Sequence, residues 1–298
     1  MARTLLARRS VGPRPVAASI VPAIMAPSAK GRSGPTPNPL DFTGKCIIVT
    51  GGTKGIGRVM ATTFMDYGAD VVVCARNAPA EPVTAAGKTA VFVPCDVRDA
   101  DQCKAVAQAA VDQFGRIDVL VNNAGGAPPA DSATVSPRFN ERVVQLNLLA
   151  AMSFSQAVYP AMIDADDGGL IINISSISGE RANPKGIAYG AAKAGLVNLA
   201  RTLAVEWGPK IRVLTVTVGL IVTEEAHLYY GDEAGMQAVA DTIPLRRMGT
   251  PEDIADAVLM LCSPLARWMT ATNVHVDGGG EIPSYLSAST GDVTRVGN

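Results

Sequence analysis

Short apolar runs along this chain alternate with longer segments in which apolar residues recur at helical spacing. The apolar runs cover residues 46–49, 70–74, 90–93, 119–121, 170–174, 211–218 and 273–276. The segments of helical spacing cover residues 58–65, 99–114, 138–162, 188–206, 224–240 and 251–261. Each run is typical of a buried strand, and alternating strands and helices indicate βαβ units with a parallel sheet covered on both faces. The pattern therefore predicts an α/β fold, a doubly wound, Rossmann-like sheet of seven strands within a single domain.

A glycine-rich turn joins the first predicted strand to the first predicted helix. Residues 50–57 read TGGTKGIG, which spaces three of the glycines as Gly-x3-Gly-x-Gly. Glycine lets the backbone approach a pyrophosphate, and the N-terminus of the following helix favours negative charge. The turn is therefore a candidate dinucleotide site, although a glycine cluster can also be only a tight turn. The candidate contacts are Gly51, Thr53, Lys54, Gly55, Ile56 and Gly57.

The second predicted strand leads into Ala75, Arg76 and Asn77. In dinucleotide folds an acidic residue near this place binds the adenosine ribose hydroxyls, whereas an arginine accommodates a 2′-phosphate. Here Arg76 follows an alanine, and Lys54 in the glycine turn adds a second cation. Because guanidinium pairs well with phosphate, the sequence favours NADP(H) over NAD(H) as cofactor. The alternative is that both cations are solvated surface charges.

A tyrosine and a lysine lie four residues apart in the predicted helix 188–206, so Tyr189 and Lys193 share one face of it. A phenol titrates near ~10, and a neighbouring cation favours phenolate and lowers that pKa. Ser176 lies thirteen residues before Tyr189 and is the candidate for holding a carbonyl oxygen; Ser175 and Ser178 flank it, so this assignment rests on spacing. The three side chains predict a proton-transfer site for a carbonyl/alcohol pair that needs a hydride partner.

Eight motifs occur in a fixed order along residues 41–282. They are the glycine turn, Asp96-Val97, the NNAG run at 122–125, Asn147, Ser176, the Tyr189 and Lys193 pair, residues 219–223 and the VDGG run at 276–279. In this order the motifs resemble the short-chain dehydrogenase/reductase family, in its compact single-domain branch. The resemblance covers nearly all of the chain outside its first forty residues.

The resemblance implies roles along the cofactor. Asp96 is similar to the family's adenine contact, with Val97 stacking nearby. The loop of Asn123, Ala124 and Gly125 resembles the one that stabilises the central sheet and lines the adenosine ribose.

The resemblance also implies roles around the reacting carbon. Asn147 resembles the helix asparagine that holds a water linking Lys193 to solvent. Ser176 looks like the carbonyl-orienting hydroxyl, Tyr189 like the acid/base, and Lys193 like the residue that binds the nicotinamide ribose and lowers the pKa of the tyrosine. Gly219, Ile221 and Thr223 look like contacts near the nicotinamide carboxamide. A homotetramer is also expected from the family.

The predicted function is an NADPH-dependent carbonyl reductase, or the reverse alcohol oxidation with NADP+. Residues 220–239 combine apolar and aromatic side chains over the expected substrate site, which favours a bulky apolar ketone such as a steroid-like, polycyclic or polyketide-derived compound. A 3-oxoacyl thioester is the main alternative substrate. A non-catalytic NADP sensor or scaffold is the alternative from another class, because a fold does not fix a function.

Composition limits the partners, the metal sites and the locations that the sequence allows. Lysine and arginine number 26 against 27 acidic residues, so the net charge of −1 favours neither nucleic acid nor an anionic membrane as partner. Five cysteines without a Cys-x-x-Cys pair, and two distant histidines, predict no metal site and a reducing, cytoplasmic location. Residues 1–40 are basic and acid-free, which predicts a disordered arm, with an organelle-targeting leader as the alternative. The predicted catalytic domain spans 41–286, and a tail follows at 287–298.

Overall fold

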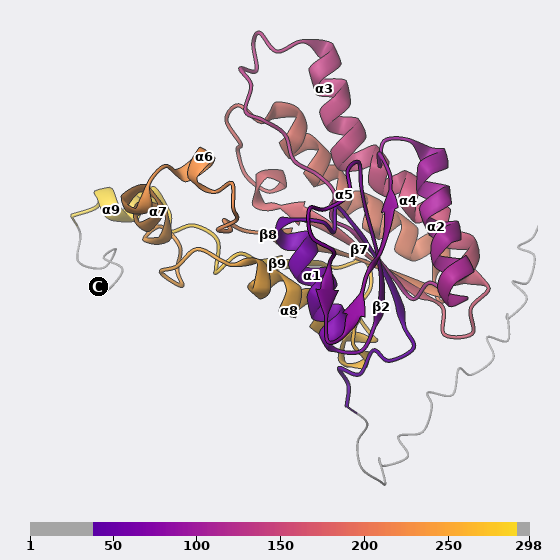
Figure 1. The fold of residues 1–298 in the computed structure, drawn as a ribbon. Coiled ribbons are helices and arrows are strands. Elements are labelled where there is room, and N and C mark those ends of the chain that lie inside the picture. The colour runs from indigo at the N-terminus through magenta and orange to yellow at the C-terminus, as the bar shows by residue number, and fades with distance from the viewer. Residues whose placement is uncertain (1–37, 291–298) are drawn as a thin grey trace, which may run out of the picture. The chain divides into compact units, whose positions relative to one another are not determined.

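The computed structural model describes residues 38–290, so most of the predicted arm and part of the predicted tail lie outside it (Figure 1). Seven parallel strands form one sheet, as predicted. Their order is β5 (Val91–Pro94), β2 (Asp70–Ala75), β1 (Cys46–Thr50), β6 (Val119–Asn122), β7 (Gly169–Ser176), β8 (Ile211–Val218) and β9 (Asn273–Val276). The central strands are apolar on both faces because both faces are covered.

Helices cover the two faces of the sheet as separate layers. The elements are α1 (Gly55–Asp66), α2 (Ala100–Phe114), α4 (Ala150–Ile163), α5 (Ile187–Trp207) and α8 (Pro251–Cys262). On one face, Phe64 of α1 and Val258 of α8 join a core with Val49. On the other, Val106 of α2 and Phe154 of α4 join a second core. Figure 1 shows α1 beside α8, and α2, α4 and α5 together on the opposite side. The fold is therefore a doubly wound, Rossmann-like sheet in a single domain.

The strand order brings the functional loops to one edge. From β1 the chain builds outward through β2 to β5, then returns to place β6 on the other side of β1. Ligands bind where the order reverses in this way, at the carboxyl ends of the strands. The register aligns Asn122 with Asn173 and Ser176 with Val218, so the loops after β6, β7 and β8 start at this same edge.

Two predicted helices are interrupted. The predicted helix at 138–162 is α3 (Pro137–Val144), a π-helical turn at Gln145–Leu149, and α4. The predicted helix at 224–240 is α6 (His227–Tyr230) and α7 (Glu233–Ala240), separated by a glycine at φ +81°. The structure adds a short hairpin, β3 (Thr84–Ala85) with β4 (Lys88–Thr89), and α9 (Ser284–Ala288).

One helical stretch within the described residues, Pro137–Ile163, is long and apolar enough to cross a membrane by length and composition alone. In this fold its α4 segment packs against the sheet through Phe154 and Val158. A core helix of an α/β domain has the same length and composition, so this stretch is weak evidence for a membrane span.

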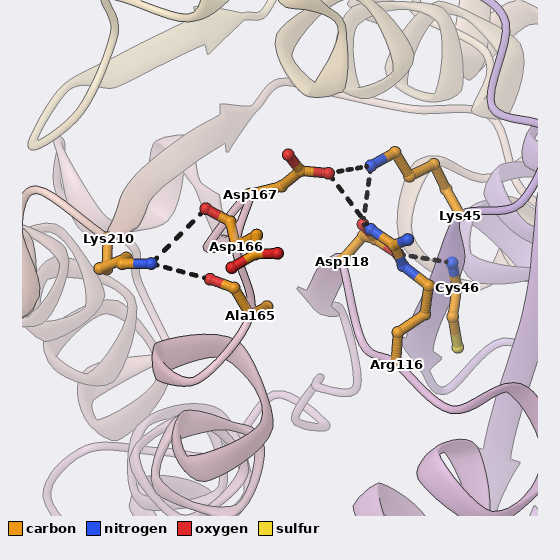
Figure 2. Close-up of polar contacts among 8 residues, drawn as sticks. All are labelled: Lys45, Cys46, Arg116, Asp118, Ala165, Asp166, Asp167 and Lys210. Carbon is orange, nitrogen blue, oxygen red and sulfur yellow. Dashed lines mark hydrogen bonds and ion pairs between the residues drawn. The ribbon is translucent and has the colours of Figure 1, made fainter.

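A polar network joins the strands at the opposite, amino-terminal edge of the sheet (Figure 2). The Asp118 carboxylate is buried, and it accepts two hydrogen bonds from Arg116 at 2.7 and 2.6 Å and one from the backbone N–H of Cys46 at 2.9 Å. Lys45 lies 3.1 Å from both Asp118 and Asp167. The network ties the start of β1 to the start of β6, away from the carboxyl edge.

We expect Asp118→Asn to lower the free energy of unfolding by about 2 kcal/mol, because it removes the buried charge that accepts hydrogen bonds from Arg116 and Cys46. Asp167→Asn is the matched control, since that carboxylate is 70 % exposed and exposed pairs contribute about 0–1 kcal/mol. Urea unfolding measures both values, and turnover of the folded variants should equal that of the wild type. Equal stability of the two variants would contradict this account of the edge.

Candidate active site

β7 and α5 bring three of the four predicted catalytic side chains together at the carboxyl edge. β7 ends at Ser176, and α5 carries Tyr189 in its first turn and Lys193 one turn later. Neighbouring residues of a strand face opposite ways. Ser175 accordingly faces α5, where its buried hydroxyl donates to the carbonyl of Lys193 at 2.8 Å and anchors the helix to the strand.

The structure separates the three serines near the end of β7. Ser175 is buried in the contact between strand and helix. The Ser176 hydroxyl accepts the backbone N–H of Ser178 at 3.2 Å, and it interacts with the phenol of Tyr189, whose pKa it lowers. Of the three serines, Ser176 is therefore the one that interacts with the phenol of Tyr189.

The Lys193 side chain is buried beside this pair. Its ammonium donates to the carbonyl oxygen of Ile174 at 2.7 Å and lies 5.7 Å from the centroid of the Tyr189 ring. Burial lowers the pKa of Lys193 to about 8, because a low dielectric disfavours the charged form. The ammonium is thus held at the carbonyl of β7, next to the ring.

The pKa of Tyr189 shifts opposite to the predicted direction. Burial raises it, the hydrogen bond with Ser176 offsets part of that rise, and the nearby Tyr229 and Tyr230 raise it further. Lys193 does not lower it here, because burial brings the pKa of Lys193 to about 8, so the lysine has lost its proton before the phenol titrates. The prediction of a lowered tyrosine pKa is therefore wrong for this structure, and its phenol is protonated at neutral pH.

Asn147 lies in the π-helical turn, which widens the helix opposite Lys193. Its side-chain oxygen accepts the N–H of Gly126 at 2.7 Å, and its nitrogen donates to the carbonyls of Gly126 at 3.0 Å and Val143 at 2.9 Å. Such π-turns often occur at functional sites. A cavity of about 10 Å³ is lined in part by Asn122, Asn147 and Lys193. That is room for one water between polar groups.

The glycine turn packs against the loop that follows β6. The Asn123 side chain donates to the carbonyl of Thr50 at 2.9 Å, and the backbone N–H of Ala124 donates to the Thr50 hydroxyl at 2.9 Å. A Cβ on Gly57 would overlap the Gly51 carbonyl oxygen and come 2.5 Å from the Asn123 amide nitrogen. Only glycine at position 57 lets the two loops meet in this way.

The first turn of α1 has the properties of an anion site. Gly55 has φ +52°, and Thr53, Lys54 and Ile56 complete the turn around it. The helix has no side-chain cap and no acidic residue in its first turn, so its positive end lacks an anion from its own helix. A phosphate-containing cofactor fits this turn on the chemistry of its donors.

The adenosine end of the predicted site contains an ion pair that the sequence analysis missed. Val97 is buried. Both oxygens of Asp96 accept from the Arg98 guanidinium, at 2.9 and 2.5 Å, and this contact is the largest cause that lowers the pKa of Asp96. Arg76 is exposed at the end of β2 and also lowers the pKa of Asp96. The adenine contact predicted at Asp96 would therefore share its carboxylate with Arg98.

The segment after β8 lies over the glycine turn. Gly219 donates its N–H to the carbonyl of Val276 at 3.0 Å, which ties the start of this segment to β9. Ile221 is buried and Thr223 is half-buried. Lys54 does not stand free for a phosphate as predicted, because its ammonium lies 2.7 Å from Glu225.

Comparisons with known proteins agree with this architecture. The family model described as enoyl-(acyl carrier protein) reductase matches residues 51–281. The chain is 36% identical over 247 residues to 7α-hydroxysteroid dehydrogenase of Escherichia coli strain K12, covering 81% of this chain and 96% of that protein.

Two solved structures have the same fold. One is a 7α-hydroxysteroid dehydrogenase complexed with NADH and 7-oxo glycochenodeoxycholic acid, with a TM-score of 0.74, 34% identity, and 82% of this chain and 97% of that chain covered. The other is the ligand-free aldohexose dehydrogenase of Thermoplasma acidophilum, with a TM-score of 0.75, 30% identity, and 87% and 98% covered.

The chain therefore belongs to the short-chain dehydrogenase/reductase family. Its fold is one that binds a nicotinamide cofactor, and its class of activity is that of an oxidoreductase for ketones and alcohols. The substrates of this family are small molecules.

Proposed function

We propose that this protein is an NADP(H)-dependent oxidoreductase that interconverts a bulky apolar ketone and its secondary alcohol. The observation that carries the proposal is the convergence of the Ser176 and Tyr189 hydroxyls at the carboxyl edge, with Lys193 and Asn147 beside them. A cofactor sensor has no need of this set of side chains, which makes catalysis the better reading.

The proposed roles divide between cofactor and substrate. When bound, the nicotinamide supplies or accepts the hydride. The glycine turn and the N-terminus of α1 hold the pyrophosphate. Lys193 holds the nicotinamide ribose, Ile221 and Thr223 flank the carboxamide, and Asp96 faces the adenine.

Tyr189 transfers the proton at the substrate oxygen, and Ser176 holds that oxygen in place. A raised pKa keeps the phenol protonated at neutral pH, which is the form that donates a proton to a forming alkoxide. The same oxygen would take the proton back in alcohol oxidation, so this group serves both directions of the proposed interconversion. Asn147 and the small cavity give Lys193 a place for one water.

The preference for NADP(H) rests on Arg76. Residues 75–77 contain no acid that would bind the ribose hydroxyls of NAD(H), and the Arg76 side chain is exposed at the end of β2. A guanidinium presents a planar fork of donors that matches a phosphate. The steroid dehydrogenase relative was solved with NADH, so NAD(H) is the alternative that the cofactor comparison below must exclude.

The substrate class rests on the segment between β8 and α8. Tyr230, Met236 and Val239 pack onto a small apolar cluster of their own, whereas Leu228 and Tyr229 are 69 % and 60 % exposed. Exposed large apolar side chains next to a polar site favour an apolar substrate. The 7α-hydroxysteroid dehydrogenase relative supports a steroid-like ketone. The family model is described as an enoyl-(acyl carrier protein) reductase, which keeps acyl thioesters as the alternative substrate class, with the 3-oxoacyl thioester as its ketone member.

Purified protein incubated with NADPH and a panel of steroid-like and polycyclic ketones should oxidise NADPH, and faster than it oxidises NADH. The matched arm of the panel contains 3-oxoacyl thioesters at equal concentration. Turnover confined to the thioesters would show that the substrate is a 3-oxoacyl thioester and not a steroid-like or polycyclic ketone. Tight NADPH binding without turnover of any ketone or thioester would favour the non-catalytic sensor.

A further inference from the structure

Lys54 and Glu225 form an ion pair between two segments that are 171 residues apart in sequence. Lys54 is the residue directly before α1, and Glu225 lies between β8 and α6. The ammonium and the carboxylate oxygen are 2.7 Å apart, with the two side chains 76 % and 56 % exposed. The pair therefore joins the proposed cofactor turn to the segment that covers the substrate site.

The fold fixes the position of this carboxylate through anchors on both sides. Ile221 pairs with Gly249, and the N–H of Val222 donates to the Gly249 carbonyl at 2.9 Å. Ala226 is 3 % exposed, and its N–H donates to the Thr223 carbonyl at 2.9 Å. Buried residues before and after it thus hold the Glu225 backbone beside the glycine turn, while its side chain reaches Lys54.

Two carboxylates face the positive end of α1. Glu225 contacts Lys54, and a carboxylate oxygen of Glu224 lies 3.7 Å from the place of a Cβ on Gly55. A helix N-terminus favours such anions, but it is also where a phosphorylated ligand binds. A carboxylate that forms an ion pair with a lysine there competes with a phosphate for the lysine ammonium.

We propose that Glu225 is a specificity-determining residue, whose carboxylate competes with the 2′-phosphate of NADP(H) for the Lys54 ammonium. The inference rests on the proposed function in one respect, that the 2′-phosphate lies within reach of Arg76 and Lys54. NAD(H) lacks this phosphate, so it leaves the ion pair intact. Binding of NADP(H) has to break the contact between Lys54 and Glu225. NADP(H) therefore binds more weakly than it would to a chain without the Glu225 carboxylate.

The expected size of the effect follows from the exposure of the pair. Exposed ion pairs are weak, so releasing Lys54 should tighten NADPH binding by about fivefold at most. We therefore expect Glu225→Gln to lower the Kd for NADPH by about threefold to fivefold at low ionic strength. The Kd for NADH should stay unchanged.

Isothermal titration of the purified full-length protein with NADPH and with NADH measures these constants without turnover. Glu224→Gln is the matched control, since it removes a neighbouring carboxylate that makes no ion pair with Lys54 within the described residues. It should change the Kd for NADPH by less than about twofold, because the remaining effect is a screened charge. Lys54→Gln should weaken NADPH alone, and adding Glu225→Gln to it should have no further effect.

Three outcomes would overturn the inference. They are an unchanged Kd for NADPH in Glu225→Gln, an equal gain in Glu224→Gln, or a gain that persists in the Lys54→Gln background. The Arg76→Ala variant distinguishes failure of this inference from failure of the proposal that the protein prefers NADP(H). If the wild type prefers NADPH and Arg76→Ala loses that preference while Glu225→Gln changes nothing, only the inference fails. If the wild type shows no preference and Arg76→Ala changes nothing, the cofactor proposal fails and the inference with it.

Discussion

Replacing Tyr189 by phenylalanine should lower kcat by about 10³-fold, within the range that a positioned general acid contributes. The substitution removes only the hydroxyl, which hydrogen bonds with Ser176. The aromatic ring keeps its place in the first turn of α5, beside the Lys193 ammonium. Cofactor binding should therefore be retained, with the Kd for NADPH by titration within about twofold of the wild type, since a loss confined to kcat removes a transition-state interaction alone.

Tyr159→Phe is the matched control for this variant. It removes a hydroxyl group from a tyrosine of α4 whose ring centroid lies 4.8 Å from that of Trp207, at the opposite end of α5 from Tyr189. Its kcat should equal that of the wild type. A Tyr189→Phe protein that kept a tenth or more of wild-type turnover would remove Tyr189 from the proton-transfer step.

The sheet could be predicted from the sequence because burial on both faces leaves a simple signal. All five residues of β1, Cys46–Thr50, are buried, and the other central strands are similarly apolar. A strand covered on both sides needs apolar residues at every position, so short apolar runs locate it. In the structure the glycine turn, Asn123 and Gly219 follow the ends of β1, β6 and β8, which places them at the carboxyl edge.

The π-helical turn could not be predicted in the same way. Residues 137–163 keep an apolar pattern throughout, and a single wide turn leaves helix on both sides of it. What identifies it is the contact of Asn147 with the backbone of Gly126, which comes from a different loop. Contacts of this kind depend on the tertiary fold rather than on local periodicity.

The partners of the charged side chains could not be predicted from the sequence either. Spacing placed Tyr189 and Lys193 on one face, but it could not show that the ammonium pairs with the carbonyl of Ile174, nineteen residues earlier. Likewise, the sequence could not show that Lys54 pairs with Glu225, which lies 171 residues later. Long charged side chains reach several alternative partners, so their pairing is set by the loops that surround them.

Replacing Lys193 by methionine should reduce activity and stabilise the folded protein. We expect kcat to fall by about 10²-fold or more, because a preorganised charge beside the reacting groups is lost. The Kd for the cofactor should rise, since Lys193 is the proposed ribose contact. The free energy of unfolding at pH 7 should increase by about 1 kcal/mol, because an apolar side chain replaces a buried ammonium that has no carboxylate partner among the described residues.

The stability gain of Lys193→Met should decrease as the pH increases. Burial lowers the folded-state pKa of Lys193 to about 8 from 10.5, so between these values the unfolded chain binds more protons than the folded one. Wild-type stability therefore rises, relative to the methionine variant, as the pH increases through this window, and the gain of Lys193→Met shrinks. Urea unfolding at pH 7, 8 and 9.5 measures the difference, and Lys104→Met, at a 69 % exposed lysine, is the control that should show no such trend. A constant difference between wild type and Lys193→Met across this range would mean that the buried ammonium keeps its proton, and the low pKa assigned to it would be wrong.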